Sequence, residues 1–374
     1  MDRVDVVIIG GGVVGCAIAC ALAGRWEDVF VLEELPRLGM LTSTRNSGVI
    51  HSGIYYPPDS LKARHCVRGN QLLYEFCAAH GVPYRKTGKI VVAYAEPDVG
   101  ALVRLMENGR ANGVDELRII DRATFRAREP HVEGFCALEV PSTGILSSED
   151  LVKTFARLAV DRGAHILNNA KVKRLESLKD AIRVTSEAGE IETRCLVNSA
   201  GLFADEVAAL LPTKMAHNFI YPVRGEYCEL VPAKRDWVRG LVYPLTRAAG
   251  MSLGVHLTKT LWGNVLVGPT ARYIADKRDY ESDRETIEQF AYNASLLLPE
   301  IQPSDLVPAY SGIRPKLIPP ISPSVGGKTM ADFIIQRDPE FPRVVHLIGI
   351  ESPGLTSAPS IAEHVLQLAG EILN

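Results

Sequence analysis

The 374-residue sequence has no excess of positive charge, because its 41 lysine and arginine residues face 44 aspartate and glutamate residues, for a formal net charge of −3. A protein without a positive field has little attraction for the phosphates of nucleic acid. We therefore expect no nucleic-acid partner. The length suits two or three compact units, and hydrophobic residues, at 47% of the chain, are numerous enough to build their cores.

The sequence also lacks an apolar run that approaches the ~20 residues of a membrane-spanning helix. Its first residues, MDRVDVVIIGGG, lead directly into a predicted strand and have none of the parts of a signal peptide. We therefore expect a cytoplasmic protein without a transmembrane segment. Peripheral contact with a membrane stays open.

Cysteines are present, but not in a pattern typical of metal or redox sites. The seven cysteines include no C-x-x-C pair and no cluster with histidine at zinc spacing. Cys16 and Cys20 lie four residues apart on one face of a predicted helix, where buried small residues packing on a sheet are the better interpretation. We expect seven reduced core residues and no metal site.

A dinucleotide fingerprint lies near the start of the chain. An apolar run from Val4 to Ile9 predicts a buried strand, and Gly10, Gly12 and Gly15 follow as G-x-G-x-x-G before a predicted helix. Glycines in this turn let backbone amides and the helix N-terminus approach a pyrophosphate. Glu33 ends the next predicted strand, where a carboxylate accepts hydrogen bonds from a ribose. The pattern predicts a βαβ unit that binds a dinucleotide, and it does not distinguish FAD from NAD.

The remaining patterns predict a nucleotide-binding fold that is interrupted twice. Helices are predicted at residues 61–80, 96–112, 148–163, 283–298 and 356–373. Strands are predicted at residues 28–34, 89–95, 165–176, 181–186, 191–201 and 344–350. Between residues 217 and 268, short strands split by turns predict an antiparallel sheet at 218–231, 240–245, 251–258 and 264–270.

This order predicts an α/β protein of two domains. The first is a Rossmann-like domain on a parallel sheet, and the second is an α+β substrate-binding, or cap, domain on an antiparallel sheet. The predicted boundaries assign residues 1–83, 145–215 and 330–374 to the first domain and residues 84–144 and 216–329 to the second.

A second strand, Gly/Pro/Ser-rich turn and helix near the C-terminus, HLIGIESPGLTSAPSIAEHV, favours FAD, because it brings more backbone amides towards a ligand that lies across the sheet. With this motif and STRNSGVIHSGIYYPPDSLKA, NSAGLFAD, PVRGEY, LGVHLT and YSGIRPK, the chain resembles the D-amino-acid-oxidase-like (DAO) FAD-dependent oxidoreductases over nearly its whole length. It is most similar to their L-2-hydroxyglutarate dehydrogenase/oxidase branch. The segment VGPTARYIADKRDYESD is shorter than the cap insert of that branch.

The resemblance implies a glutathione-reductase-like FAD-binding domain, with STRNSGVIH running along the flavin. It implies non-covalent FAD, because residues 341–374 contain no cysteine of the kind that some relatives attach to flavin. The residues expected to contact FAD are Gly10, Gly12, Val13, Val14, Gly15, Glu33, Glu34, Thr44, Arg45, Asn46, Ser47, His51, Val172, Ala200, Gly201, Gly312, Arg314, Glu351, Ser352, Pro353, Gly354, Leu355 and Thr356.

His51 is the candidate base for the oxidation of a secondary alcohol, in which a hydroxyl proton leaves while a hydride goes to flavin N5. A neutral imidazole with an ordinary pKa of about 6.5 is a competent base near neutral pH. The alternative interpretation is that His51 only contacts the flavin or fills the core. Arg314, between Gly312 and Pro315, is expected on a rigid turn, where its guanidinium group pairs with a substrate carboxylate or phosphate.

Lys316, His256 and Tyr243 are further candidates for the same pocket, and each is also explained as an ordinary residue of the sheet. The leading hypothesis is oxidation of an L-2-hydroxy acid, with L-2-hydroxyglutarate first, to the 2-oxo acid. Oxygen, a quinone or another acceptor takes the electrons. The alternatives are a glycerol-3-phosphate or amino-acid oxidase or dehydrogenase, a protein that holds FAD only as a structural or redox group, and an NAD-dependent dehydrogenase.

Overall fold

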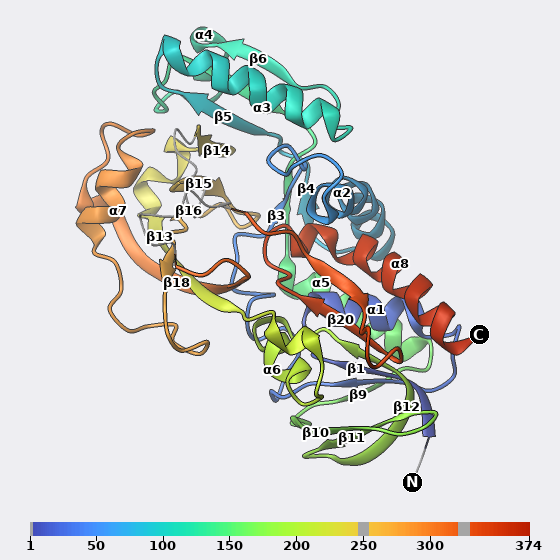
Figure 1. Cartoon of the computed structure of the whole chain (residues 1–374). Helices are drawn as coiled ribbons and strands as arrows, with labels where there is room; N and C mark the ends of the chain where they lie inside the picture. Colours follow the sequence, from blue (N-terminus) through green and yellow to red (C-terminus); the bar gives the residue numbers. More distant parts are fainter. Residues whose placement is uncertain (1–2, 246–253, 321–329) are drawn as a thin grey trace.

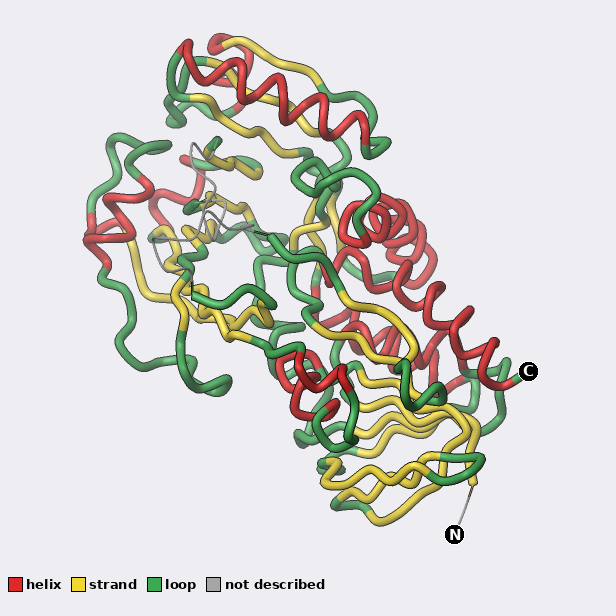
Figure 2. The backbone as a smooth tube through the Cα atoms, viewed as in Figure 1, coloured by secondary structure: helices red, strands yellow, loops and turns green. Residues whose placement is uncertain are grey.

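The computed structural model describes residues 3–245, 254–320 and 330–374. Their strands form two large sheets at opposite ends of the molecule, and a small sheet of three strands lies between them (Figure 1). Helices gather beside the sheet that contains the N-terminus and on the outer sides of the other one (Figure 2).

The first sheet has the parallel core that the glycine motif predicted. Strand β1 pairs in parallel with β2 and β12, β2 pairs with β9, and β12 pairs with β20. Antiparallel strands β10, β11 and β19 extend it. The bounds are β1 Arg3–Ile9, β2 Val29–Leu32, β9 His165–Leu167, β10 Val172–Ser177, β11 Ile182–Ser186, β12 Gly189–Asn198, β19 Ile334–Arg337 and β20 Val344–Ile348.

Four helices cover one face of this sheet and share its main hydrophobic core. Small side chains on α1 allow it to pack closely against the strands and against α5 and α8, and α2 packs on α8. Their bounds are α1 Val13–Leu22, α2 Leu61–His80, α5 Ser148–Asp161 and α8 Gly354–Leu373. All seven cysteines are free and buried, as expected from their spacing.

The second sheet follows the order β17-β13-β16-β15-β14-β5-β7-β6, and β18 pairs with β13. It was predicted as antiparallel, but β14 pairs with β5 in parallel, so the sheet is mixed. The bounds are β5 Lys89–Ala93, β6 Arg118–Asp121, β7 Cys136–Val140, β13 Tyr221–Leu230, β14 Leu241–Pro244, β15 His256–Lys259, β16 Val265–Gly268, β17 Arg272–Tyr273 and β18 Leu306–Lys316. Helices α3 Val99–Ala111, α4 Arg122–Arg128 and α7 Ile287–Ala294 pack against it.

The small sheet consists of β3 Val49–Ile50, β8 Gly144–Leu146 and β4 Tyr84–Arg85. Two of the predicted domain boundaries, 83/84 and 144/145, fall at or within these strands, and the division into two domains stays a prediction. The remaining helical elements are α6 Ala204–Ala208 and the 3₁₀ turns Glu96–Asp98, Gly201–Phe203, Lys214–His217, Pro232–Trp237 and Pro303–Asp305.

Two predicted elements differ from the structure. The helix predicted at 283–298 is shorter because Thr286 caps it by accepting a hydrogen bond from the amide of Gln289. The strand predicted at 165–176 is two strands, β9 and β10, which are separated near Asn169, a residue with a φ of 54°. The predicted strand 251–258 lies partly outside the described residues, and of its described part residues 256–258 belong to β15.

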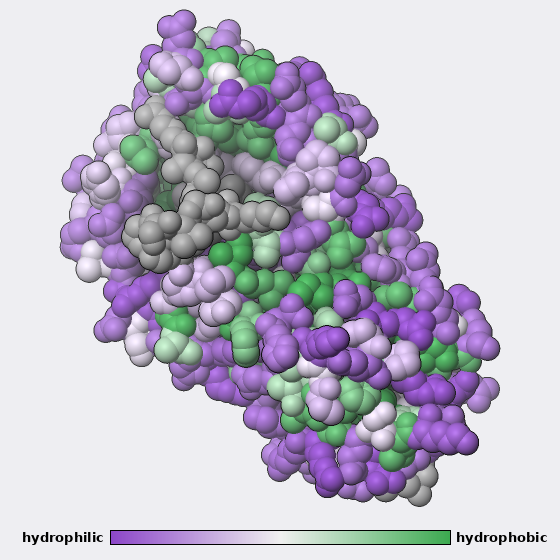
Figure 3. Space-filling view, in the orientation of Figure 1, coloured by the Kyte–Doolittle hydropathy of each residue, from purple (hydrophilic) through white to green (hydrophobic). Residues whose placement is uncertain are grey.

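On the face shown in Figure 3, hydrophilic residues cover most of both ends of the molecule, and hydrophobic residues gather across the middle. Within the part of the chain that the structure describes, no helix has both the length and the apolar character needed to cross a membrane.

Candidate active site

Two cavities meet at the glycine turn. The larger, of about 450 Å³, reaches towards the second sheet, and the smaller, of about 360 Å³, lies beside the ends of β1 and β2. Both are lined by Gly12, Thr42, Ser43, Ser199 and Gly201. Together they form an elongated space with its junction at the N-terminus of α1, which is the place where a dinucleotide pyrophosphate binds in this type of fold.

The glycine turn is held closely against β1 and against the segment after β12. A Cβ atom on Gly15 would lie 1.9 Å from the carbonyl oxygen of Gly10, and Gly10 itself has a φ of 102°. Gly12 is the N-cap of α1, and the amide of Val13 donates to Ser43 Oγ at 2.9 Å. Gly10 and Gly12 line the cavities, whereas Gly15 lies behind them and sets the packing of helix on strand.

Glu33 lies at the smaller cavity, as the fingerprint predicted. Its Oε2 accepts from the amide of Gly11 at 2.7 Å, and its Oε1 accepts from the amide of Leu35 at 2.8 Å. Burial raises the pKa of Glu33, while these backbone hydrogen bonds act in the opposite direction. Glu34, Val172 and Ala200 line the same cavity. The carboxylate oxygens retain acceptor capacity for a ribose hydroxyl.

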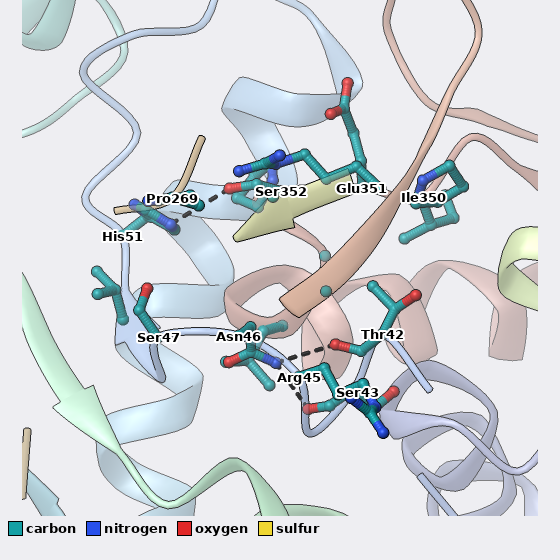
Figure 4. Close-up of a pocket in the computed structure, with 18 of the residues that line it drawn as sticks. Thr42, Ser43, Arg45, Asn46, Ser47, His51, Pro269, Ile350, Glu351 and Ser352 are labelled. Carbon is teal, nitrogen blue, oxygen red and sulfur yellow. Dashed lines mark hydrogen bonds between the residues drawn. The ribbon is translucent and has the colours of Figure 1, made fainter. Parts of the chain in front are cut away.

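The segment between the two cavities is tied into a compact turn (Figure 4). Asn46 Nδ2 donates to the carbonyl oxygens of Thr42, at 3.1 Å, and Ser43, at 2.8 Å. Arg45 places its guanidinium carbon 4.4 Å from the centroid of the Tyr280 ring. Arg45, Asn46 and Ser47 line the larger cavity, but Thr44 does not, because its hydroxyl donates to the carbonyl of Gly39.

His51 lies in the wall of the larger cavity, with Nε2 3.3 Å from Ser352 Oγ (Figure 4). Its backbone amide donates to Thr356 Oγ1 at 2.9 Å, and its carbonyl accepts from Asn70 Nδ2 at 2.9 Å. Burial, and secondly the charge of Lys89, lower the pKa of His51 to about 3. The expected pKa of about 6.5 is therefore wrong, and the imidazole is neutral throughout the physiological range.

Arg314 also lines the larger cavity, but it lies in strand β18 and not on a turn. The sequence suggested a turn because proline has no N–H to donate to a neighbouring strand. In the structure Pro315 lies opposite Pro222, and the pairing of β13 with β18 continues through this position. The Arg314 guanidinium packs on Gly225, where a Cβ atom would lie 2.6 Å from Nη1. Nη1 donates to the carbonyl of Thr270 at 3.3 Å, and no acidic side chain pairs with Arg314 among the described residues.

Two residues after Arg314, Lys316 joins a buried cluster with Glu351 and Lys62. Lys62 Nζ lies 2.9 Å from Glu351 Oε1, and Lys316 Nζ lies 3.1 Å from Glu351 Oε2. Burial raises the pKa of Glu351, but the two ammonium charges outweigh this effect and leave the pKa below its usual value. Both lysines and Glu351 line the larger cavity, so with Arg314 it has more cationic than anionic side chains at this point.

Tyr243 and His256 form another part of the same wall. Their rings are stacked with centroids 3.6 Å apart and planes inclined by 12°. Burial raises the pKa of Tyr243. The structure therefore brings all five residues predicted to contact substrate into one cavity, namely His51, Tyr243, His256, Arg314 and Lys316.

Of the residues predicted to contact FAD, the cavities are lined by all but Gly15, Thr44 and Thr356. Thr356 is fully buried and holds the wall by bonding to the backbone of His51 and Val49. Sequence reasoning missed the cavity residues Ser43, Lys62, Tyr55 and Tyr56. All four lie in the motif STRNSGVIHSGIYYPPDSLKA, so the sequence indicated that this segment belongs to the site but not which of its side chains line the cavity.

Comparison with known proteins agrees with this geometry. Residues 5–368 match the DAO family, described as FAD dependent oxidoreductase. The chain is 35% identical over 410 residues to the mitochondrial L-2-hydroxyglutarate dehydrogenase of Arabidopsis thaliana, covering 97% of this chain and 83% of the relative. It is 32% identical over 406 residues to the L-2-hydroxyglutarate dehydrogenase of Escherichia coli K12, covering 99% and 94%.

A solved structure of similar fold is the dithionite-reduced L-α-glycerophosphate oxidase of Mycoplasma pneumoniae with FAD bound. It superposes with a TM-score of 0.86 at 26% sequence identity and covers 100% of this chain and 95% of its own. The chain therefore shares the overall fold of this FAD-containing oxidase.

Proposed function

Because the chain belongs to the DAO family of FAD-dependent oxidoreductases, we propose that it oxidises L-2-hydroxyglutarate to 2-oxoglutarate. Relatives with that activity in their names match at 32 to 35% identity over nearly the whole chain. The observation that carries the proposal is the composition of the larger cavity, in which the neutral His51 shares one space with Arg314, Lys316 and Lys62.

These cations suit a substrate with two carboxylates. Arg314 has no acidic partner among the described residues, and its planar fork can bind one carboxylate through two hydrogen bonds. Lys316 and Lys62 share a single acid, Glu351, so this cluster retains a net positive charge for a second carboxylate. L-2-hydroxyglutarate has a carboxylate at each end of its chain, so it supplies one negative charge to each of these two positive positions.

The two cavities fit FAD, with the adenosine half beside Glu33, the pyrophosphate at Gly12 and the flavin in the larger cavity. Bound FAD supplies a hydride acceptor. We propose that FAD is held without a covalent bond, since none of the seven cysteines lines either cavity.

In this proposal His51 accepts the proton of the substrate hydroxyl at Nε2, where that hydroxyl takes the place of the neighbouring Ser352 Oγ. Arg314 fixes the substrate carboxylate and thereby the face from which the hydride leaves. Tyr243 and His256 exclude water from one side of the cavity. An anionic substrate beside His51 also makes the imidazole a stronger base than it is in the empty cavity.

The identity of the electron acceptor stays a prediction, with oxygen, a quinone or another acceptor as candidates. The cytoplasmic location also stays a prediction, as does any peripheral contact with a membrane.

Glycerol 3-phosphate is the second candidate substrate, because the structurally similar protein from Mycoplasma pneumoniae is a glycerophosphate oxidase. A phosphate binds Arg314 as readily as a carboxylate does. The amino-acid oxidases and dehydrogenases of the family remain a further alternative.

The deciding experiment is anaerobic mixing of the purified holoprotein with L-2-hydroxyglutarate, D-2-hydroxyglutarate, L-lactate, glycerol 3-phosphate and L-amino acids while the flavin absorbance is followed. We expect rapid bleaching by L-2-hydroxyglutarate and little by its D-enantiomer or by lactate, which has one carboxylate. Faster bleaching by glycerol 3-phosphate or an amino acid would replace the proposed substrate. No bleaching by any of them would favour a structural or redox role for FAD, and a colourless protein would favour NAD.

A further inference from the structure

Lys89 is a buried lysine with no assigned role. It begins strand β5, in the second sheet, and is only 3% exposed. Its Nζ has no hydrogen-bond partner, and no acidic side chain pairs with it among the described residues. A lysine is rarely buried in this way without a partner, because burial disfavours its charged form.

Two aromatic rings form a cage around this amine. Lys89 Nζ lies 4.7 Å from the ring centroid of Tyr55 and 4.7 Å from that of Tyr243. Both tyrosines line the larger cavity, so Lys89 lies directly behind the wall of the proposed substrate site. The faces of the rings stabilise a cation but cannot accept its proton, so an ammonium group here has no counter-charge in the part of the chain that the structure describes.

The charge of Lys89 acts on His51, whose pKa it lowers in addition to the effect of burial. The other titratable groups around the amine are Cys66 on α2 and the hydroxyls of Tyr55 and Tyr243. Burial raises the pKa of each of them, so all three stay neutral near neutral pH. Burial lowers the pKa of Lys89 to about 7. Lys89 is therefore the member of this cluster whose charge changes near neutrality.

We propose that Lys89 is a positioning residue that controls His51 electrostatically. When Lys89 is charged, it favours binding of the anionic substrate. When Lys89 is neutral, it makes His51 the stronger base. The inference rests on the proposed function, because it assumes that His51 takes the substrate proton. It has two consequences of opposite sign. As pH rises and Lys89 loses its proton, substrate affinity falls and the rate of flavin reduction at saturating substrate rises.

The test is anaerobic stopped-flow reduction of the holoenzyme by L-2-hydroxyglutarate between about pH 5.5 and 9. We expect the limiting rate of flavin reduction and the Kd each to rise about three- to tenfold across the titration of Lys89, which corresponds to a change of up to one pKa unit at His51. The anionic substrate moves this titration to higher pH in the complex than in the free enzyme. A parent enzyme in which both quantities are constant across this range overturns the inference.

Two variants separate the charge of Lys89 from its packing. Lys89→Met removes the charge, so the pH transitions of the rate of flavin reduction and of the Kd should both disappear. At low pH this variant should reduce its flavin faster than the parent and bind substrate more weakly. Lys89→Arg retains a permanent charge and should show the slow rate and tight binding at every pH. A purely structural role predicts slower reduction in both variants with the parental transitions retained, and that result overturns the inference.

The matched control is Lys86→Met. Lys86 lies on the same segment and also over a tyrosine ring, with Nζ 5.7 Å from the centroid of Tyr74, but it is exposed and does not line the cavity. The Lys86→Met variant should keep the parental pH transitions of the rate of flavin reduction and of the Kd. Failure of the parent to be reduced by L-2-hydroxyglutarate at any pH contradicts the proposed function, whereas reduction with unaltered transitions in Lys89→Met contradicts only the role of Lys89.

Discussion

Nε2 of His51 lies 3.3 Å from Oγ of Ser352, so the segment after β3 and the turn before α8 meet through two side chains in the wall of one cavity. The imidazole is further fixed through its backbone, which bonds to Thr356 and Asn70. Nε2 is the nitrogen proposed to take the substrate proton, so Ser352 Oγ marks the place that the substrate hydroxyl occupies in the complex, and the first prediction below depends on this arrangement.

His51→Asn should retain FAD but reduce its flavin about 10²- to 10⁴-fold more slowly, because the base is lost while much of the side-chain volume remains. Ser352→Ala should leave the rate of reduction within about fivefold of the parent, because Ser352 Oγ lies at the nitrogen that the substrate hydroxyl occupies in the complex. The anaerobic rate of flavin reduction measures both. Because burial lowers the pKa of His51 to about 3, protonation of this residue gives the parent no acidic limb near pH 6.5. If His51→Asn reduces its flavin within a few-fold of the parent, His51 is not the base.

Arg314→Ala should weaken substrate binding by about 2 to 5 kcal/mol, because a charge-assisted contact to a desolvated anion is lost. Arg314→Lys should recover part of this loss, since lysine supplies the charge without the planar fork. FAD content should be unchanged in both variants. Arg68→Ala, which removes an exposed arginine paired with Glu363, is the control and should bind substrate normally. Equal Kd values for parent and Arg314→Ala would remove Arg314 from the substrate site.

Gly225→Ala should reproduce much of the Arg314→Ala defect without touching the arginine. A Cβ atom at this position would lie 2.6 Å from Arg314 Nη1, so the guanidinium has to move away from its present place. We expect weaker substrate binding with normal FAD content, measured by the same titration. Adding Gly225→Ala to Arg314→Ala should cause no further loss of affinity. A full additional loss would show that Gly225 acts through another group.

Gly12→Val should yield a folded protein without flavin. Gly12 lines both cavities at the N-cap of α1, so a branched side chain there occupies the space of the pyrophosphate. The FAD content per chain, read from the absorbance of the purified protein, measures the effect. Gly100→Ala on α3 is the control, because its added methyl group would contact only the Arg104 guanidinium, at 3.5 Å. A yellow Gly12→Val protein would place the pyrophosphate elsewhere.

His65 should make the fold less stable in acid. Burial, and secondly the charge of His364, lower the pKa of His65 to about 4 in the folded protein, whereas an unfolded histidine titrates near 6.5. Between these values the unfolded chain binds a proton that the folded chain does not, so the free energy of unfolding falls as pH falls. The slope from this residue is on the order of 1 kcal/mol per pH unit.

Urea unfolding at several pH values between about 4 and 7 measures this slope. His65→Gln should lower it, and the exposed control His217→Gln should leave it unchanged. Identical slopes in the parent and His65→Gln would contradict the role of His65.

The first βαβ unit could be predicted from the sequence because its signals are local. The strand, the glycines of the turn and Glu33 all lie within the first 33 residues, and each type of residue is required by its own position. The capped helix after Ser60 is equally local, since the Ser60 side chain accepts from the amide of Ala63 and Gly81 ends the helix at a φ of 70°.

The placement of Arg314 could not be predicted, because it depends on pairing between distant segments. Strand β18 forms by pairing with β13, and in this pairing Arg314 lies opposite Val223. The cage around Lys89 depends on three separate segments and gives no pattern in any one of them. Thr44 was misassigned for a related reason, since hydroxyl residues at neighbouring positions face different sides of one tight turn.

The pairing of β20 with β12 has a consequence for how the protein acquires its cofactor. The cavity that begins at Gly12 is closed by residues 351–355, more than 300 positions later in the chain. A nascent chain that has completed β1 and α1 therefore lacks the opposite wall, and FAD can stabilise only chains in which both segments have met. Such distant pairings form slowly, so the supply of FAD should govern the yield of folded protein during synthesis.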